Sequence, residues 1–236
     1  MPSFEWNNVH ARIQGIPILH GVSLAVSLGE VVALLGRNGM GKTTTLKAAM
    51  GLVDITEGNL VADGRPITFD PPYRRRQSGL FFVPEDAGIF QSLTVEDNLR
   101  IGSDRNPQRV LEAFPELRPL WRRRAGLLSG GERKILALAR AYLAEARWIL
   151  IDEPSLGLAP RVMPRIAEAI RHLAEQGGVV LVEQNVRLAE EAAQRYALMD
   201  QGRIIETGAI HRLRTSQAFQ QHLLDWGKEA TATHDG

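Results

Sequence analysis

The stretch that decides the fold is residues 31–43, VVALLGRNGMGKT, in which a short apolar run leads into the pattern G-x-x-x-x-G-K-[ST]. An apolar run of this length, bounded by turn residues, is typical of a buried strand. Glycines allow the backbone N–H groups that follow to curl around a polyphosphate, and a helix N-terminus adds a favourable dipole. We therefore expect a strand over 31–35, a phosphate-binding loop, and a helix over 41–51.

The loop predicts a nucleotide site. The residues expected to surround the phosphates are Gly36, Arg37, Asn38, Gly39, Met40, Gly41, Lys42, Thr43 and Thr44. Lys42 would reach the β- and γ-phosphates, and the hydroxyl of Thr43 would bind Mg²⁺. The alternative is a glycine-rich turn that only caps a core helix. The strand before the loop and the helix after it favour the nucleotide site.

Similar apolar runs alternate with helical patterns along the chain. Strands are indicated at 80–83, 148–151 and 179–182, and amphipathic helices at 131–144, 161–175 and 186–196. Turn residues predict a hairpin over 55–69, with turn signals at 57–59 and 63–64, and another hairpin turn at 200–203. This alternation indicates an α/β fold, a P-loop NTPase with a mainly parallel sheet covered on both faces.

We expect one domain over residues 1–236. Residues 1–85 and 145–226 would form the nucleotide-binding core, together with an antiparallel β subdomain. Residues 86–144 would form a small helical subdomain, because 86–128 is rich in Arg and Pro and has no strongly apolar strand. Residues 227–236 are polar and are expected to form a disordered tail.

Composition excludes several classes of protein. The chain has no Cys, so disulfides and thiolate metal sites are excluded. Its net charge of +1 lacks the positive balance that nucleic-acid binding usually shows, and no nucleic-acid partner is expected. The apolar runs are far shorter than the roughly 20 residues that a membrane-spanning helix needs. We therefore expect a cytoplasmic protein whose role at a membrane depends on a partner.

A second motif, WILIDE at 148–153, is an apolar strand that ends in two carboxylates. Next to a phosphate-binding loop, Asp152 would hold Mg²⁺ through water. Glu153 would then point at the attacking water and act as general base. Taken alone, an acidic strand end is usually a solvated edge, and the first motif makes the catalytic interpretation the stronger one.

A third motif, LSGGE at 128–132, leads into the helix predicted at 131–144. Ser129, Gly130 and Gly131 could form a second anion site at a helix N-terminus. The alternative is an ordinary helix cap, since Ser before two glycines caps well. One phosphate loop does not need another, so the pair of motifs suggests a nucleotide held from two sides, between two chains.

The order of these motifs resembles the nucleotide-binding subunit of ABC transporters over nearly the whole chain. VPE at 83–85, LTVEDNL at 93–99, DEPSLGLAP at 152–160 and LVEQN at 181–185 are similar to the LivF-type ATPase of branched-chain amino-acid importers. The resemblance implies ATP and Mg²⁺ as ligands and a homo- or heterodimer with another ATPase subunit. It also implies transmembrane permeases and a periplasmic or extracellular substrate-binding protein, with this chain on the inner face of the cell membrane.

Two residues depart from the wider family pattern. Glu85 stands where most members have the glutamine of the Q-loop, and the resemblance implies that it could bind Mg²⁺ or orient water. Gln184 stands where most have the switch histidine. Its amide can donate to a γ-phosphate oxygen but, unlike histidine, cannot take up a proton and become charged. Both residues are familiar in the branched-chain branch. With Glu153 and Lys42, they complete the expected catalytic set.

The aromatic residue on which relatives stack adenine is replaced by Ile13. His10 or Trp6 could substitute for it, or both could be ordinary core or surface residues. Base stacking contributes roughly 1–3 kcal/mol in other proteins. Its loss would weaken nucleotide binding and base selectivity without abolishing them.

Other interpretations stay open. Relatives that import urea or short amides have similar ATPases, and non-transport ABC ATPases act in DNA repair and translation. A catalytically dead regulatory module is disfavoured because Lys42 and Glu153 are both present. The basic runs 74–76 and 122–124 are expected on a solvated surface, or in contact with phosphate or lipid. The transported substrate and the choice between homodimer and heterodimer cannot be read from the residues.

Overall fold

The computed structural model describes residues 2–221 of the chain. Within this range the larger sheet has the strand order β10-β9-β3-β8-β7-β6. Its strands are β3 (Val31–Leu35), β6 (Leu80–Val83), β7 (Trp148–Asp152), β8 (Gly178–Glu183), β9 (Arg195–Asp200) and β10 (Arg203–Ala209). All neighbours are parallel except β9 and β10, which form the predicted hairpin. The predicted mainly parallel sheet is thereby confirmed.

The smaller sheet is antiparallel, with the order β2-β1-β4-β5. Its strands are β1 (Ser3–Ile13), β2 (Ile16–Ser27), β4 (Asp54–Ala62) and β5 (Arg65–Pro66). The turn at 63–64 is confirmed, but the turn at 57–59 was wrong. Residues 57–59 lie inside β4, opposite a register shift in β1. These turn-forming residues accommodate the shift in strand register between β1 and β4, and β4 continues past them.

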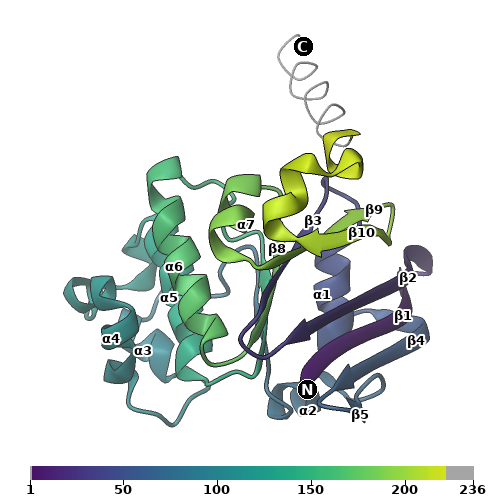
Figure 1. Cartoon of the computed structure of the whole chain (residues 1–236). Helices are drawn as coiled ribbons and strands as arrows, with labels where there is room; N and C mark the ends of the chain where they lie inside the picture. Colours follow the sequence, from purple (N-terminus) through teal and green to yellow (C-terminus); the bar gives the residue numbers. More distant parts are fainter. Residues whose placement is uncertain (1, 222–236) are drawn as a thin grey trace.

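Helix α1 (Lys42–Met50) lies between the two sheets, as Figure 1 shows. Its buried side chains pack with those of β1 and β3 in one apolar core. A second core lies on the other face of the larger sheet, under α5 (Gly130–Leu143), α6 (Met163–Ala174) and α7 (Val186–Ala192). The parallel strands are therefore covered on both faces, which explains why β3, β7 and β8 are buried along their whole length.

The helix predicted over 186–196 is shorter in the structure. It ends at Ala192, and Arg195 begins strand β9. Tyr196, Ala197 and Leu198 pair with β3 and are buried in the sheet. The last residues of the predicted helix, Arg195 and Tyr196, therefore belong to a buried strand that continues beyond it.

The segment 86–128 is helical, as predicted, and supplies no strand to either sheet. It contains α3 (Val95–Arg100), α4 (Val110–Ala113) and the 3₁₀ helices η1 (Pro107–Arg109), η2 (Pro115–Leu120) and η3 (Ala125–Leu127). The remaining short helices are α2 (Pro72–Gln77), η4 (Pro160–Val162) and η5 (Ile210–Thr215). Among residues 2–221, no helix combines the length and apolar character needed to cross a membrane. The predicted tail, 227–236, lies outside the described residues.

Candidate functional site

The loop between β3 and α1 depends on two glycines. A Cβ on Gly36 would lie 2.5 Å from the carbonyl oxygen of Met199, so no side chain fits there. Gly41, the N-cap residue of α1, has a φ of 100°, a conformation that other residues rarely adopt. The backbone can therefore turn directly from the strand end into the helix.

The loop encloses one side of an open cavity of about 240 Å³. Its lining residues are Ile18, Asn38, Gly39, Gly41, Lys42, Thr43, Thr44 and Glu153. Six of the predicted phosphate-binding residues are among them, whereas Gly36, Arg37 and Met40 belong to the loop but do not line the cavity. The cavity thus lies at the N-terminus of α1, where amide groups and the helix dipole favour an anion.

Lys42 and Glu153 meet at this cavity. The Nζ atom of Lys42 lies 3.2 Å from Oε1 of Glu153, and both side chains are almost fully buried. Lys42 also donates a hydrogen bond of 2.9 Å to the carbonyl of Arg37. Glu153 directly follows β7, and its N–H group donates to the carbonyl of Val182 in β8. The end of the central sheet therefore fixes the carboxylate against the phosphate-binding loop.

Thr43 and Asp152 form a second pair. The hydroxyl of Thr43 donates to Oδ1 of Asp152 over 3.0 Å. Burial raises the pKa of Asp152 above its usual range; the Thr43 hydrogen bond and Lys42 oppose this, and the carboxylates of Glu153 and Glu85 add to it. A nearby cation would stabilise the charged form of this buried carboxylate.

The Thr43–Asp152 pair suits a Mg²⁺ ion that takes most of its ligands from water and from substrate phosphate. Among residues 2–221, no group of three or more His, Asp or Glu side chains is arranged to hold a metal ion. Mg²⁺ usually takes one or two carboxylates and fills its other positions with water and substrate phosphate oxygens. A single carboxylate beside a hydroxyl at the mouth of a phosphate loop matches that requirement.

Glu85 lies beside this pair. A second cavity, of about 320 Å³, is lined by Thr43, Lys47, Phe82, Pro84, Glu85, Asp86 and Asp152. Glu85 follows β6 and has an exposed side chain. The structure therefore places Glu85 together with the other two predicted metal ligands, Thr43 and Asp152, at the carboxyl edge of the larger sheet.

Gln184 joins the loop to the carboxylate. Its Nε2 atom lies 3.1 Å from each carboxylate oxygen of Glu153 and 2.5 Å from Oδ1 of Asn38. Gln184 directly follows β8, the strand between β3 and β7 in the sheet. Three consecutive strands of the sheet thus deliver the phosphate loop, Glu153 and Gln184 to one place.

The signature motif is separate from this site within one chain. Ser129 is the N-cap of α5, and its hydroxyl and the carboxylate of Glu132 form a reciprocal capping box. Ser129, Gly130 and Gly131 line neither cavity. Within one chain the motif therefore forms a helix cap, and its possible role as a second anion site stays a prediction.

Two buried charged residues were missed by the sequence analysis. Lys134 on α5 donates to the backbone carbonyls of Glu85 and Glu153. Burial lowers the pKa of Lys134. Glu183, the last residue of β8, is 1% exposed and accepts four hydrogen bonds. The available signals were a lysine on an otherwise apolar helix face and an acidic residue ending an apolar run.

The predicted substitutes for an adenine-stacking residue do not line the cavity. Trp6 is fully buried and donates to the carbonyl of Thr45 over 3.1 Å, so its assignment as a possible stacker was wrong. His10 lies on β1 beside Glu57, and Ile13 pairs with Ile16 at the end of the β1–β2 hairpin. Ile18 of β2 is the apolar side chain that lines the cavity.

The basic runs do not form uniform solvated surfaces. Arg75 is buried, which corrects the expectation for that residue, whereas Arg74 is exposed. In the second run, Arg122 forms an ion pair of 2.6 Å with Glu96. These contacts give Arg75 and Arg122 partners within the chain.

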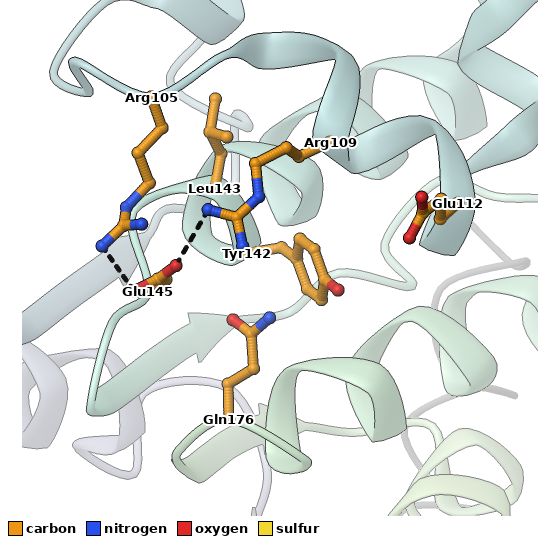
Figure 2. Close-up of a pocket in the computed structure, with 7 residues that line it drawn as sticks. All are labelled: Arg105, Arg109, Glu112, Tyr142, Leu143, Glu145 and Gln176. Atoms are coloured by element: carbon orange, nitrogen blue, oxygen red, sulfur yellow. Dashed lines mark hydrogen bonds and ion pairs between the residues drawn. The ribbon is translucent and has the colours of Figure 1, made fainter.

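A further cavity, of about 110 Å³, contains none of the predicted site residues. Figure 2 shows its lining residues: Arg105, Arg109, Glu112, Tyr142, Leu143, Glu145 and Gln176. Glu145 pairs with Arg105 at 2.5 Å and with Arg109 at 3.4 Å. Glu145 thus bridges two arginines and lies outside both cavities of the nucleotide site.

Comparison with known proteins places this geometry in a family. Residues 19–156 match the model of the ABC transporter family. The chain is 39% identical to the branched-chain amino acid transport ATP-binding protein BraG of Pseudomonas aeruginosa, over 82% of this chain and 88% of that protein. It is 34% identical to the probable branched-chain amino acid transport ATP-binding protein LivF of Archaeoglobus fulgidus, over 90% of this chain and 94% of that protein. It is also 39% identical to the lipopolysaccharide export system ATP-binding protein LptB of Haemophilus influenzae, over 86% of this chain and 89% of that protein.

Solved structures show the same fold. A nucleotide-free ATP-binding cassette from an ABC transporter superposes with a TM-score of 0.83, covering 94% of this chain and 99% of that chain at 24% identity. An ATP-binding subunit of an ABC transporter superposes with a TM-score of 0.78 at 25% identity, covering 94% of this chain and 98% of that chain. The predicted fold is thereby confirmed, and the chain belongs to the ABC transporter family as a nucleotide-binding, ATP-hydrolysing subunit of the LivF type.

Proposed function

We propose that this subunit hydrolyses Mg-ATP at the loop cavity and drives a membrane importer of branched-chain or related amino acids. One observation carries the catalytic part of the proposal. Glu153 is held by Lys42 on one side and by the Gln184 amide on the other, beside the Thr43–Asp152 pair. This arrangement supplies a base, a phosphate-binding cation and a metal-binding pair at one point.

Binding would begin at the loop. Its backbone N–H groups and the N-terminus of α1 would surround the β- and γ-phosphates. In the part of the chain that the structure describes, the ammonium of Lys42 contacts the carbonyl of Arg37 and the carboxylate of Glu153. A phosphate oxygen would replace the carboxylate as partner of Lys42, which would leave Glu153 able to accept a proton. Thr43 and Asp152 would hold Mg²⁺, which neutralises charge on the phosphate oxygens.

Hydrolysis would then depend on Glu153. Its carboxylate would accept a proton from the attacking water, and Gln184 would keep both carboxylate oxygens aimed at the cavity. An amide cannot take up that proton, so Gln184 would position the base and donate to the γ-phosphate. Glu85, beside the metal pair, would bind Mg²⁺ through water or orient the attacking water.

The signature motif would complete the site from another chain. Ser129, Gly130 and Gly131 lie at the N-terminus of α5 and outside both cavities of their own chain. A second ATPase subunit, identical or related, would place this helix N-terminus against the γ-phosphate. The dimer would act on transmembrane permeases from the inner face of the membrane, with a substrate-binding protein on the other side.

The substrate class rests on relatives and on two residues. BraG and LivF are both named for branched-chain amino acid transport. Glu85 and Gln184 are, by the resemblance described above, familiar in that branch. A second candidate is export of lipopolysaccharide, because LptB of Haemophilus influenzae is as similar to this chain as BraG is.

The catalytic proposal is tested by Glu153→Gln, which keeps the size of the side chain and removes the base. ATP turnover should fall by about 100-fold or more, with ATP binding retained. The matched control is Glu145→Gln, at the cavity shown in Figure 2, which should keep the turnover of the unaltered protein. Equal turnover in Glu153→Gln and Glu145→Gln would contradict the assignment of the base.

The transport proposal is tested by the permease that purifies with this subunit. Reconstituted into vesicles, the complex should take up labelled leucine or a related amino acid when ATP is supplied on the subunit's side. Glu153→Gln should abolish this uptake. Extraction of lipopolysaccharide by the same complex, with no amino-acid uptake, would establish the export alternative and contradict import.

A further inference from the structure

Glu183 is a buried carboxylate whose hydrogen-bond partners, among the described residues, are Ser155 and the backbone N–H groups of Gln184 and Asn185. It ends strand β8 and is 1% exposed. Oε1 accepts from the N–H group of Ser155 at 2.9 Å, and Oε2 accepts from the hydroxyl of Ser155 at 2.8 Å. Oε2 also accepts from the N–H groups of Gln184 and Asn185, both at 3.0 Å. One carboxylate therefore ties two separate segments together.

The first of these segments is the loop 155–158, which leaves the sheet just after Glu153. Ser155 is buried against Glu183, but Leu156 is 51% exposed. Gly157, also exposed, has a φ of 72°. The loop thus presents an apolar side chain outward while Ser155 anchors it inside the molecule. Leu156 is thus joined to Glu183 through its neighbour Ser155.

The second segment is the backbone that carries Gln184. The Gln184 amide reaches both oxygens of Glu153, as described above, and Glu183 accepts from the N–H groups of Gln184 and Asn185 in the same backbone. Ser155 and Gln184 bind the same carboxylate oxygen. The Ser155 hydroxyl therefore helps to anchor the oxygen that accepts from the N–H group of Gln184, and movement of Ser155 would shift that acceptor.

We propose that Glu183 is a positioning residue that couples the exposed loop 155–158 to the hold of Gln184 on Glu153. The inference rests on the proposed function, because the output of the coupling is the rate of ATP hydrolysis. All four of its bonds need an acceptor, and an ionised carboxylate is acceptor-only. Glutamine at this position offers one acceptor oxygen and turns an NH₂ group towards donors.

The main experiment is a double-mutant cycle on the full chain. Glu183→Gln should lower kcat by about tenfold, with KM for ATP changed by less than about twofold. In a Gln184→Ala background, the same substitution should change kcat by less than about twofold, because the contact through which it acts is gone. Single-turnover assays with enzyme in excess detect the slow hydrolysis of these variants.

A structural role alone predicts another result. If Glu183 only maintains the fold, Glu183→Gln lowers kcat by the same factor in both backgrounds, and that outcome overturns the proposal. Wild-type kcat in Glu183→Gln overturns it as well. If turnover persists in Glu153→Gln, the assignment of the base fails instead, so the two failures are distinguishable.

Ser155→Ala provides a second, milder variant that removes only the hydroxyl donor. It should lower kcat by about threefold and lose this effect in the Gln184→Ala background. Hydrogen exchange should also become faster at the amides of Gln184 and Asn185, although the substitution lies in the other segment. Unchanged exchange at those two amides overturns the coupling even if Glu183→Gln does not fold.

Discussion

At the scale of single residues, the site combines an unusual backbone with a desolvated acid. Glu153 has a φ of 40°, in the left-handed region that residues with side chains rarely adopt. Such conformations cost of order 1–3 kcal/mol and gather at functional sites. Asp152, the preceding residue, is buried with its carboxylate beside Thr43. Two adjacent acidic residues are thus held in positions that serve a ligand better than they serve stability.

Replacing Asp152 should therefore stabilise the protein in a pH-dependent way. Because the pKa of Asp152 is raised, mainly by burial, the folded state binds this proton more tightly than the unfolded state does. The cost is complete above the raised pKa and disappears below the ordinary pKa of aspartate. Asp152→Asn keeps the acceptor for Thr43 and should unfold at higher urea than the unaltered protein at pH 7.5.

The difference in urea midpoint should shrink as the pH is lowered through the raised pKa of Asp152. Urea unfolding at pH 7.5, 6 and 5 measures it, and ATP turnover should be lost in Asp152→Asn at every pH. A stability difference that is constant across this range, or of opposite sign, would show that the carboxylate is not strained by burial.

At the scale of elements, the C-terminus of α1 is held by a side chain from α2. Arg75 donates to the carbonyls of Ala48 and Ala49 in α1, and also to those of Thr68 and Asp70. The last carbonyls of a helix have no partner inside the helix and carry the negative end of its dipole. One buried guanidinium therefore closes α1 and fixes the loop 68–70 beside it.

Arg75→Met should cost about 3 kcal/mol of unfolding free energy, because four backbone carbonyls, three of them in buried hydrogen bonds, lose a charged donor. The neighbouring Arg74→Met is the matched control, since Arg74 is exposed, and should change stability by about 0.5 kcal/mol or less. Urea unfolding of both variants measures the difference. Equal effects at the two positions would contradict a structural role specific to Arg75.

At the scale of the whole molecule, the two predicted anion sites do not meet. The loop cavity lies where β3 enters α1, and the signature motif caps α5 on the other side of the larger sheet. Within one chain, Ser129 therefore cannot help to hold a phosphate at Lys42. Joining the two motifs on one nucleotide requires a second chain.

Glu153→Gln with Mg-ATP should therefore elute as a dimer in size-exclusion chromatography, and the unaltered protein mostly as a monomer. The γ-phosphate persists in the variant, so the contact with Ser129 of a second chain would be retained. Adding Ser129→Arg should dissolve the dimer and leave ATP bound. A Glu153→Gln protein that stays monomeric, alone and with a cognate sister ATPase, would contradict the two-sided site.

The local sequence determined much of the fold. The strands at 31–35, 80–83, 148–151 and 179–182 were correctly predicted because each is a short apolar run between turn or charged residues, and burial on both faces demands such a run. The P-loop was equally readable, because Gly36 and Gly41 are dictated by backbone geometry. Strands β1 and β2 were missed because register shifts interrupt the alternation of their residues.

Only the tertiary structure decided which charged residues are buried and what they bind. Nothing in the run 74–76 distinguishes Arg75 from Arg74, and their difference arises because α2 presents one of them to the end of α1. Gln184, Glu153 and Asn38 are far apart in sequence, and they meet because β8 lies between β3 and β7. Motifs depend on local backbone geometry, which the sequence encodes directly, whereas hydrogen bonds between distant segments depend on strand order and packing.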